Sequence, residues 1–422
     1  MMNLLTTYFL IFLLVVIQVI NLYCNYDLVI FLVSFSILIH FMVMYSVKAN
    51  QSYFIFLFFA ITYPIFILIS YFLEVPYHLY LAYQNNELTS FVFFIQTLSL
   101  LLMFLRINKK QFSSFSWNEV LDVRKDGLIY YSSYLVLIVM IPLSLIGKET
   151  VLSNGGYGGN SDSSIFFEYC LIFMIVCWLY SGNNRNKLLL LFGIMLVYLI
   201  LPLMFGKRLP FIMVSLLIFN FYFLNRFSNK FIILSLLGML FILSVLALSR
   251  VGSSFDVGIL NLLVNVDDNG VMANNQGGVV VSAASYLGLV EDGYFDWLFR
   301  LSSFFGTLVS PFTIGKFNVS EAYINTSAMK YTAIPGNGGL PGVYFYIWGG
   351  WGLLISMSLA FAVAFSTVGK SRLISIYVLF LLITFPRWYA YNMLIIFKMG
   401  FWLIFIISFC DIFYKWRKKQ CS

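Results

Sequence analysis

The sequence has little charge, little histidine and no paired cysteines. Asp, Glu, Lys and Arg together make up 10% of its 422 residues, whereas soluble domains contain about 25%. The five cysteines include no Cys-x-x-Cys pair, so their spacing predicts neither a disulfide framework nor a metal site. We interpret the two histidines, His40 and His78, as a packed core residue and a solvated loop residue. We therefore expect no metal and no other cofactor.

Apolar residues are abundant instead. They make up 61% of the chain, and the mean hydropathy is +0.91. A membrane-spanning helix needs about 20 apolar residues. Twelve segments approach or reach this length, at 4–23, 28–46, 52–73, 90–105, 128–147, 165–181, 188–206, 209–224, 231–249, 342–366, 373–392 and 394–414. The sequence therefore predicts an all-α polytopic membrane protein with about twelve transmembrane helices.

Basic residues are concentrated in alternate connections between these segments. With the N-terminus in the cytoplasm, the cytoplasmic connections and the C-terminal tail hold 16 of the 25 Lys and Arg residues but only four acids. This asymmetry follows the positive-inside rule, so we expect a multi-pass protein with both termini in the cytoplasm. The same distribution accounts for the pI of about 9.1 without a nucleic-acid partner.

One connection is far longer than the others. The segment 251–341 is predicted to lie on the outer face, and it mixes acidic, basic, aromatic and glycine residues. Structureless loops of this length are uncommon, so we expect an external cap that is partly helical around 293–308. The chain then divides into 1–250 with nine helices, the cap at 251–341, and 342–422 with three helices and a basic cytoplasmic tail.

Five basic residues depart from the positive-inside pattern and are predicted to lie near the outer membrane surface: Lys207, Arg208, Arg250, Arg387 and Lys398. Charges at this depth are costly and are often functional. A guanidinium donates paired hydrogen bonds to phosphate oxygens and stays charged at accessible pH. We therefore expect the three arginines to hold a lipid diphosphate and the two lysines to assist. Alternatively, these side chains reach lipid phosphates or pair with acids such as Glu168.

The architecture and three short motifs resemble those of a known family. The motifs are Gly206-Lys207-Arg208 at the mouth of a mid-chain helix, Arg250 at the start of the long loop, and Gly349-Gly350-Trp351-Gly352 after it. Together with about twelve helices, they are similar to O-antigen polymerases (Wzy) and O-antigen ligases over nearly the whole chain. The resemblance implies a GT-C-like, metal-independent glycosyltransferase of the bacterial inner membrane with its active site on the periplasmic side.

Within this resemblance, one missing histidine favours the polymerase. Ligases carry a His-Asn pair before the Gly-x-x-Gly helix, where this sequence has Pro335-Gly336-Asn337-Gly338. A polymerase moves the growing glycan from undecaprenyl diphosphate to the non-reducing end of another undecaprenyl-diphosphate-linked repeat unit. The implied partners are this lipid-linked oligosaccharide, membrane lipid, a chain-length regulator and a flippase. The ligase stays an alternative, and so does a flippase or transporter of the same glycan, although the lack of a visible internal repeat disfavours a transporter.

Carboxylates of the long loop are candidates for the base that accepts the proton of the acceptor hydroxyl. They are Asp267, Asp268, Glu291, Asp292, Asp296 and Glu321. Asp267-Asp268 before Asn-Gly is typical of an exposed turn, and Glu291-Asp292 is typical of a helix start. Glu321 is nearest the returning helix and is the candidate that we select.

The glycines at the start of the tenth predicted helix are interpreted as structural. Gly349, Gly350 and Gly352 fall within a short stretch of an apolar segment. Small residues in membrane helices often let a neighbouring helix approach closely. The sequence therefore predicts close helix packing at these positions.

Overall fold

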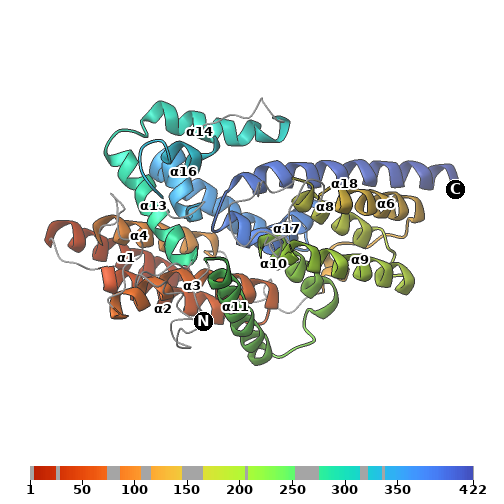
Figure 1. Ribbon diagram of the computed structural model, residues 1–422, viewed down its shortest axis with the longest axis horizontal. Coiled ribbons are helices and arrows are strands. Elements are labelled where there is room, and N and C mark those ends of the chain that lie inside the picture. Colours follow the sequence, from red (N-terminus) through yellow and green to blue (C-terminus); the bar gives the residue numbers. More distant parts are fainter. Residues whose placement is uncertain are drawn as a thin grey trace.

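The computed structural model describes residues 4–24, 29–73, 86–105, 116–144, 165–204, 208–251, 275–313, 322–334 and 338–421 (Figure 1). Within these ranges the chain is helical and forms no strand, and the one β-type contact is an isolated bridge between Lys125 and Ser181. The helical character predicted from the sequence is confirmed.

The helices follow one another along the chain with short connections between many of them. Their bounds are α1 Leu4–Cys24, α2 Val29–Val47, α3 Gln51–Leu73, α4 Asn86–Met103, α5 Trp117–Val120, α6 Gly127–Leu143, α8 Ile165–Leu179, α9 Arg185–Met204, α10 Arg208–Ile218, the π-helix η1 Phe219–Phe223, α11 Asn229–Val251, α13 Asn275–Glu291, α14 Trp297–Val309, the 3₁₀ turn η2 Ser310–Phe312, α15 Ile324–Ala328, α16 Pro341–Ser366, α17 Arg372–Trp388 and α18 Leu394–Cys421.

Six of these helices are long and apolar enough to cross a membrane: α2, α3, α4, α9, α16 and α18. Shorter apolar stretches lie in α1, α6, α8, α10 to η1, and α11. An apolar helix exposes large hydrophobic side chains only where lipid or another protein covers them, and α1 exposes Leu5, Phe9 and Phe12 in this way. The chain is therefore a helical membrane protein.

The helices form two groups that α17 and α18 join. In the first group α4 packs against α2, α13 and α16, and α2 packs against α3; in the second, α8 packs against α6 and α9, and α10 packs against α9. Helix α17 contacts α3, α10, α16 and α18, while α18 also reaches α8 and α14 (Figure 1). The large core is continuous through both groups.

Helix α13 belongs to the segment 251–341 and yet contributes to the core. It packs against α3, α4 and α16, and Val280, Ala284 and Leu287 are almost fully buried. Small residues on α13 allow this close approach. The segment that was predicted as an external cap thus supplies a buried helix, followed by α14 and α15.

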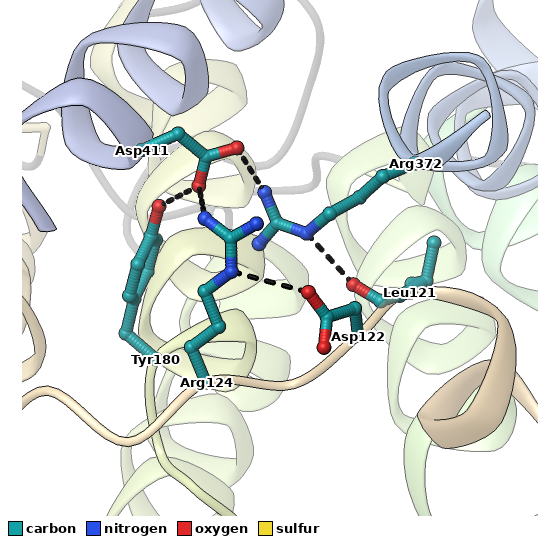
Figure 2. A network of polar contacts seen from close by, with 6 residues as sticks. All are labelled: Leu121, Asp122, Arg124, Tyr180, Arg372 and Asp411. Carbon is teal, nitrogen blue, oxygen red and sulfur yellow. Dashed lines mark hydrogen bonds and ion pairs between the residues drawn. The ribbon is translucent and has the colours of Figure 1, made fainter. Parts of the chain in front are cut away.

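One end of the bundle is held by a cluster of ionic contacts (Figure 2). Asp411 of α18 accepts hydrogen bonds from Arg124 Nη1 at 2.6 Å, from Arg372 Nη1 and from the hydroxyl of Tyr180. Arg372 Nε also donates to the Leu121 carbonyl oxygen at 2.9 Å. The cluster therefore joins α18, the start of α17, the end of α8 and the connection before α6.

A second set of hydrogen bonds ties further connections together at this end. Asn220 Oδ1, in η1, accepts from Ser52 Oγ at 2.6 Å and from Trp117 Nε1 at 2.8 Å. Asn229 Nδ2 donates to the Lys48 carbonyl oxygen at 2.8 Å. Because Lys48, Trp117, Arg124 and Arg372 all belong to connections predicted to be cytoplasmic, we call this the basic end and the other the opposite end.

We predict that Asp411→Ala destabilises the protein strongly. Arg124 and Arg372 have side chains only 16% and 13% exposed, and removing their shared carboxylate leaves two largely buried cations without it. Breaking such an ion pair costs about 3 kcal/mol. Thermal unfolding of the purified protein in detergent, followed by tryptophan fluorescence, measures the loss.

Asp122→Asn is the matched control for this variant. Asp122 is 69% exposed and pairs with the same Arg124, Nε to Oδ2, at 3.2 Å. Its φ of 49° is tolerated by asparagine, and exposed ion pairs contribute at most about 1 kcal/mol. Equal melting temperatures for Asp411→Ala and Asp122→Asn would contradict the central role of Asp411.

Candidate functional site

The opposite end of the bundle carries an ion pair beneath the segment that contains α15. Arg387 lies in the last turn of α17, and Glu168 lies in the first turn of α8. Arg387 Nε and Glu168 Oε1 are 3.2 Å apart, with side chains 29% and 21% exposed. The Arg387 guanidinium carbon is 5.9 Å from the centre of the Tyr391 ring. The pair is therefore partly accessible and lies against an aromatic surface.

Two tyrosines lie near this pair. Tyr323, just before α15, is close enough to Glu168 and Arg387 for both charges to act on its hydroxyl, and the Tyr391 ring lies beside Arg387. Burial raises the pKa of Tyr323, and nearby Arg387 partly opposes this shift. Phenol groups of this kind stay protonated at neutral pH, so they donate as well as accept hydrogen bonds. We call Arg387, Glu168, Tyr323 and Tyr391 the Arg387 cluster.

The segment before α16 is fixed over the Arg387 cluster by side chains from α13 and α16. Tyr344 Oη donates to the Tyr391 carbonyl oxygen at 2.8 Å, and Tyr286 Oη donates to Asn325 Oδ1 at 3.2 Å. Gly338 lies so close to the backbone of Tyr391 that a Cβ atom would overlap with it. The chain after α17 is therefore held against α16 and the residues just before it, and α15 is held against α13.

Of the other cations predicted for this site, the structure gives a side-chain contact for Lys398 and only a position in a helix for Arg208 and Arg250. Lys398 Nζ, in the second turn of α18, donates to the Thr313 carbonyl oxygen at 3.2 Å. Arg208 is the first residue of α10, and Arg250 precedes the last residue of α11. Both positions lie toward the opposite end, because α10 leads into η1 and α11 starts at Asn229, both at the basic end. Lys207 falls outside the described residues.

Among these cations, the described side chains do not share one partner. Arg387 pairs with Glu168, whereas Lys398 bonds to the turn that follows α14. The pairing with Glu168 is the alternative that the sequence raised for this group of residues. It leaves part of the Arg387 side chain exposed, so a phosphate oxygen can still approach the guanidinium.

Among the described carboxylates of the long segment, one has a clear structural role. Asp296 caps α14 by accepting from the Phe299 N–H at 2.7 Å. Glu291 is the last residue of α13, so the prediction of a helix start there was wrong. Burial and the nearby charges of Glu87 and Asp292 raise the pKa of Glu291. Glu321, Asp267 and Asp268 fall outside the described residues.

Helix α16 is broken, and an arginine that sequence reasoning did not select stabilises the break. Gly349 and Gly350 have non-helical dihedral angles, with φ 59° and ψ −148° at Gly350. Arg300 of α14 donates from Nε to the Ile347 carbonyl oxygen at 2.5 Å and from Nη2 to the Tyr346 carbonyl oxygen at 2.9 Å. It therefore satisfies carbonyls that the break removes from the helix ladder.

The close packing predicted for these glycines was wrong at Gly352, where a Cβ would meet nothing within 4 Å. The atoms nearest to a Cβ at Gly349 belong to Leu353 of its own helix. Gly350 has a positive φ, which side chains disfavour. The signal in the sequence was the adjacent pair Gly349-Gly350, which is typical of a helix break.

His40 is a core residue, as predicted. It is buried, and its Nδ1 lies 2.7 Å from the Ser36 carbonyl oxygen one turn earlier. His78 falls outside the described residues. Within the described ranges, no group of three or more His, Cys, Asp or Glu side chains could hold a metal ion.

The geometry defines a helical membrane protein with a partly exposed arginine–glutamate pair at one end. Comparison with known proteins found no matching family model, no matching curated protein and no matching solved structure.

We predict that Gly350→Ala destabilises the protein while Gly352→Ala does not. Alanine at Gly350 must adopt a backbone conformation that costs of order 1–3 kcal/mol, whereas Gly352 lies in helical, open surroundings. The melting temperatures of the two purified variants test this. An unchanged melting temperature for Gly350→Ala would show that α16 can straighten without loss of stability.

Proposed function

We propose that this protein is an O-antigen polymerase, a glycosyltransferase that uses polyprenyl-diphosphate-linked donors. The observation that carries the proposal is the Arg387 cluster: a partly exposed guanidinium beside tyrosine hydroxyls at the end of the bundle opposite the basic end. A guanidinium suits a diphosphate, and hydroxyls and aromatic rings suit a sugar. The resemblance in architecture and motifs supports the same assignment.

The topology that this function requires has twelve spans, with the Arg387 cluster facing the periplasm. The clustering of Lys48, Arg124 and Arg372 at one end supports it, because basic connections are retained in the cytoplasm. Short apolar helices such as α8 and α10 then complete the set of spans. The inner-membrane location in bacteria is part of the same proposal.

In the proposed reaction the acceptor hydroxyl attacks the anomeric carbon of the donor glycan. A carbon–oxygen bond forms, the bond from the anomeric carbon to the phosphate oxygen breaks, and undecaprenyl diphosphate leaves. Arg387, with Arg208 and Arg250, balances the negative charge that grows on the leaving diphosphate, and Lys207 and Lys398 add positive charge nearby. Glu321 is the proposed base that accepts the hydroxyl proton.

Glu168 has a separate role in this proposal. It lies 3.2 Å from the Arg387 side chain and compensates its charge. Both side chains are more exposed than those around Asp411, which lowers the cost of separating them, so a diphosphate with two formal charges competes with one carboxylate for the guanidinium. Arg387 is thereby kept in position until substrate arrives.

We predict that Arg387→Ala, Arg208→Ala and Arg250→Ala each abolish chain extension while protein stays in the membrane. Arg→Lys at each position restores it only in part, because the paired donors are lost. The length distribution of lipopolysaccharide on a gel measures the outcome in cells that carry each variant. Normal ladders from all three alanine variants would remove these residues from the site.

A matched control is Arg185→Ala, which removes an exposed arginine at the basic end, where α9 begins. It should leave the ladder unchanged. Cells that lack the protein should make lipopolysaccharide with a single repeat unit. Complete absence of repeat units would instead favour a flippase, and unlinked polymer on undecaprenyl diphosphate would favour a ligase.

A further inference from the structure

A groove on the side of the bundle lies between α3, α10 and α11. Its volume is about 230 Å³, which is below the range of about 300–1,000 Å³ that holds whole small ligands. It is lined by Ile55, Leu216, Phe219, Phe231, Leu236 and Met239, with four further residues. Phe231 is half exposed, so the groove opens sideways toward the surroundings of the bundle.

The lining is almost entirely apolar. Its two polar residues are Ser215 and Ser235, and Ser215 Oγ donates to the Phe211 carbonyl oxygen at 2.8 Å within its own helix. Such a serine offers little polarity to an occupant. A site of this size and chemistry suits part of one hydrocarbon chain, and in a membrane-spanning protein the adjacent hydrocarbon is lipid.

One end of the groove is rigid. Phe227 lines it, and the Phe227 carbonyl oxygen accepts from Gln51 Nε2 at 2.7 Å. Gln51 Oε1 in turn accepts from the Asn225 N–H at 2.8 Å, and Asn229 Nδ2 donates to the Lys48 carbonyl oxygen. These contacts fix the base of α11 against the α2–α3 turn.

Cations are adjacent to this same end in the chain. Arg226 and Lys230 are exposed and flank Phe227 and Asn229 in the chain, and Lys48 belongs to the turn bonded to Asn229. Among the described residues, neither Arg226 nor Lys230 is in an ion pair. Three positive charges at the head-group end of an apolar groove are complementary to a lipid phosphate, and basic pockets between membrane helices bind anionic lipids.

We propose that this groove binds one acyl chain of an anionic phospholipid whose head-group phosphate lies against Arg226, Lys230 and Lys48. Binding of this kind is possible in either orientation in the membrane, because it involves only the groove and the charges at its end. It is independent of the proposed glycosyltransferase activity, since the groove lies toward the basic end and the Arg387 cluster at the opposite end.

The experiment is native mass spectrometry of the full chain, extracted from bilayers of equal phosphatidylethanolamine and phosphatidylglycerol. The wild-type protein should retain one phosphatidylglycerol in preference to phosphatidylethanolamine. Each cation near an anionic lipid contributes roughly a fivefold preference, so Arg226→Ala combined with Lys230→Ala should lower the preference roughly 25-fold. Lys415→Ala combined with Lys418→Ala removes two exposed cations at the basic end of the bundle and should leave the lipid preference unchanged.

A second variant tests the groove itself. Ser235→Phe fills it and should abolish the retained lipid, whereas Leu234→Phe changes a side chain that is 68% exposed on the same helix and outside the groove. Equal retention of both lipids by the wild type would overturn the proposal. So would unchanged retention in Ser235→Phe, or a dimer of the chain that Ser235→Phe dissociates, because a second copy would then occupy the groove.

Discussion

The arrangement at the basic end depends on a single carboxylate that two guanidiniums share. Asp411 compensates Arg124 and Arg372 where water has little access, and a charge left alone there would be unfavourable by several kcal/mol. The three side chains come from elements far apart in the sequence. Their mutual requirement therefore fixes how α18, α17 and the connection before α6 meet, and through them how the two groups of helices join.

Backbone polar groups also need partners where water has little access, as the break in α16 shows. A break in a membrane helix frees carbonyl groups that lipid cannot satisfy. Arg300 supplies two donors to the Tyr346 and Ile347 carbonyl oxygens, and it reaches them because α14 packs along α16. The part of α16 before the break carries Tyr344, whose hydroxyl donates to the Tyr391 carbonyl oxygen. The break thus helps to form the surface on which the Arg387 cluster lies.

Much of the fold could be predicted from the sequence, because the signal of a membrane helix is local. A run of apolar residues such as 341–366 predicts its helix without knowledge of any neighbour. Helix α13 could not be found in this way. Its valines and alanines are buried against other helices, where small side chains that fit closely are favoured. Its mean hydropathy therefore does not distinguish it from an ordinary helix. The hydrogen bonds of Arg300 could not be predicted either, because every residue has a backbone carbonyl group and the sequence does not show which of them need a donor.

The candidate site was only partly predictable for a related reason. Arg387 was predicted from its position near a membrane surface, and Glu168 was one possible partner because of its charge. Whether Arg387 pairs with lipid, substrate or a carboxylate depends on how α17 packs against its neighbours, which the sequence does not show. The two ends of the protein then differ in one physical respect. Asp411 lies among side chains only 13–17% exposed, which makes its ion pairs costly to separate. Glu168 and Arg387 are 21% and 29% exposed, so water can replace part of their attraction. Exchange of a partner is therefore easier at the Arg387 cluster than at the basic end, and that difference is what a binding site requires.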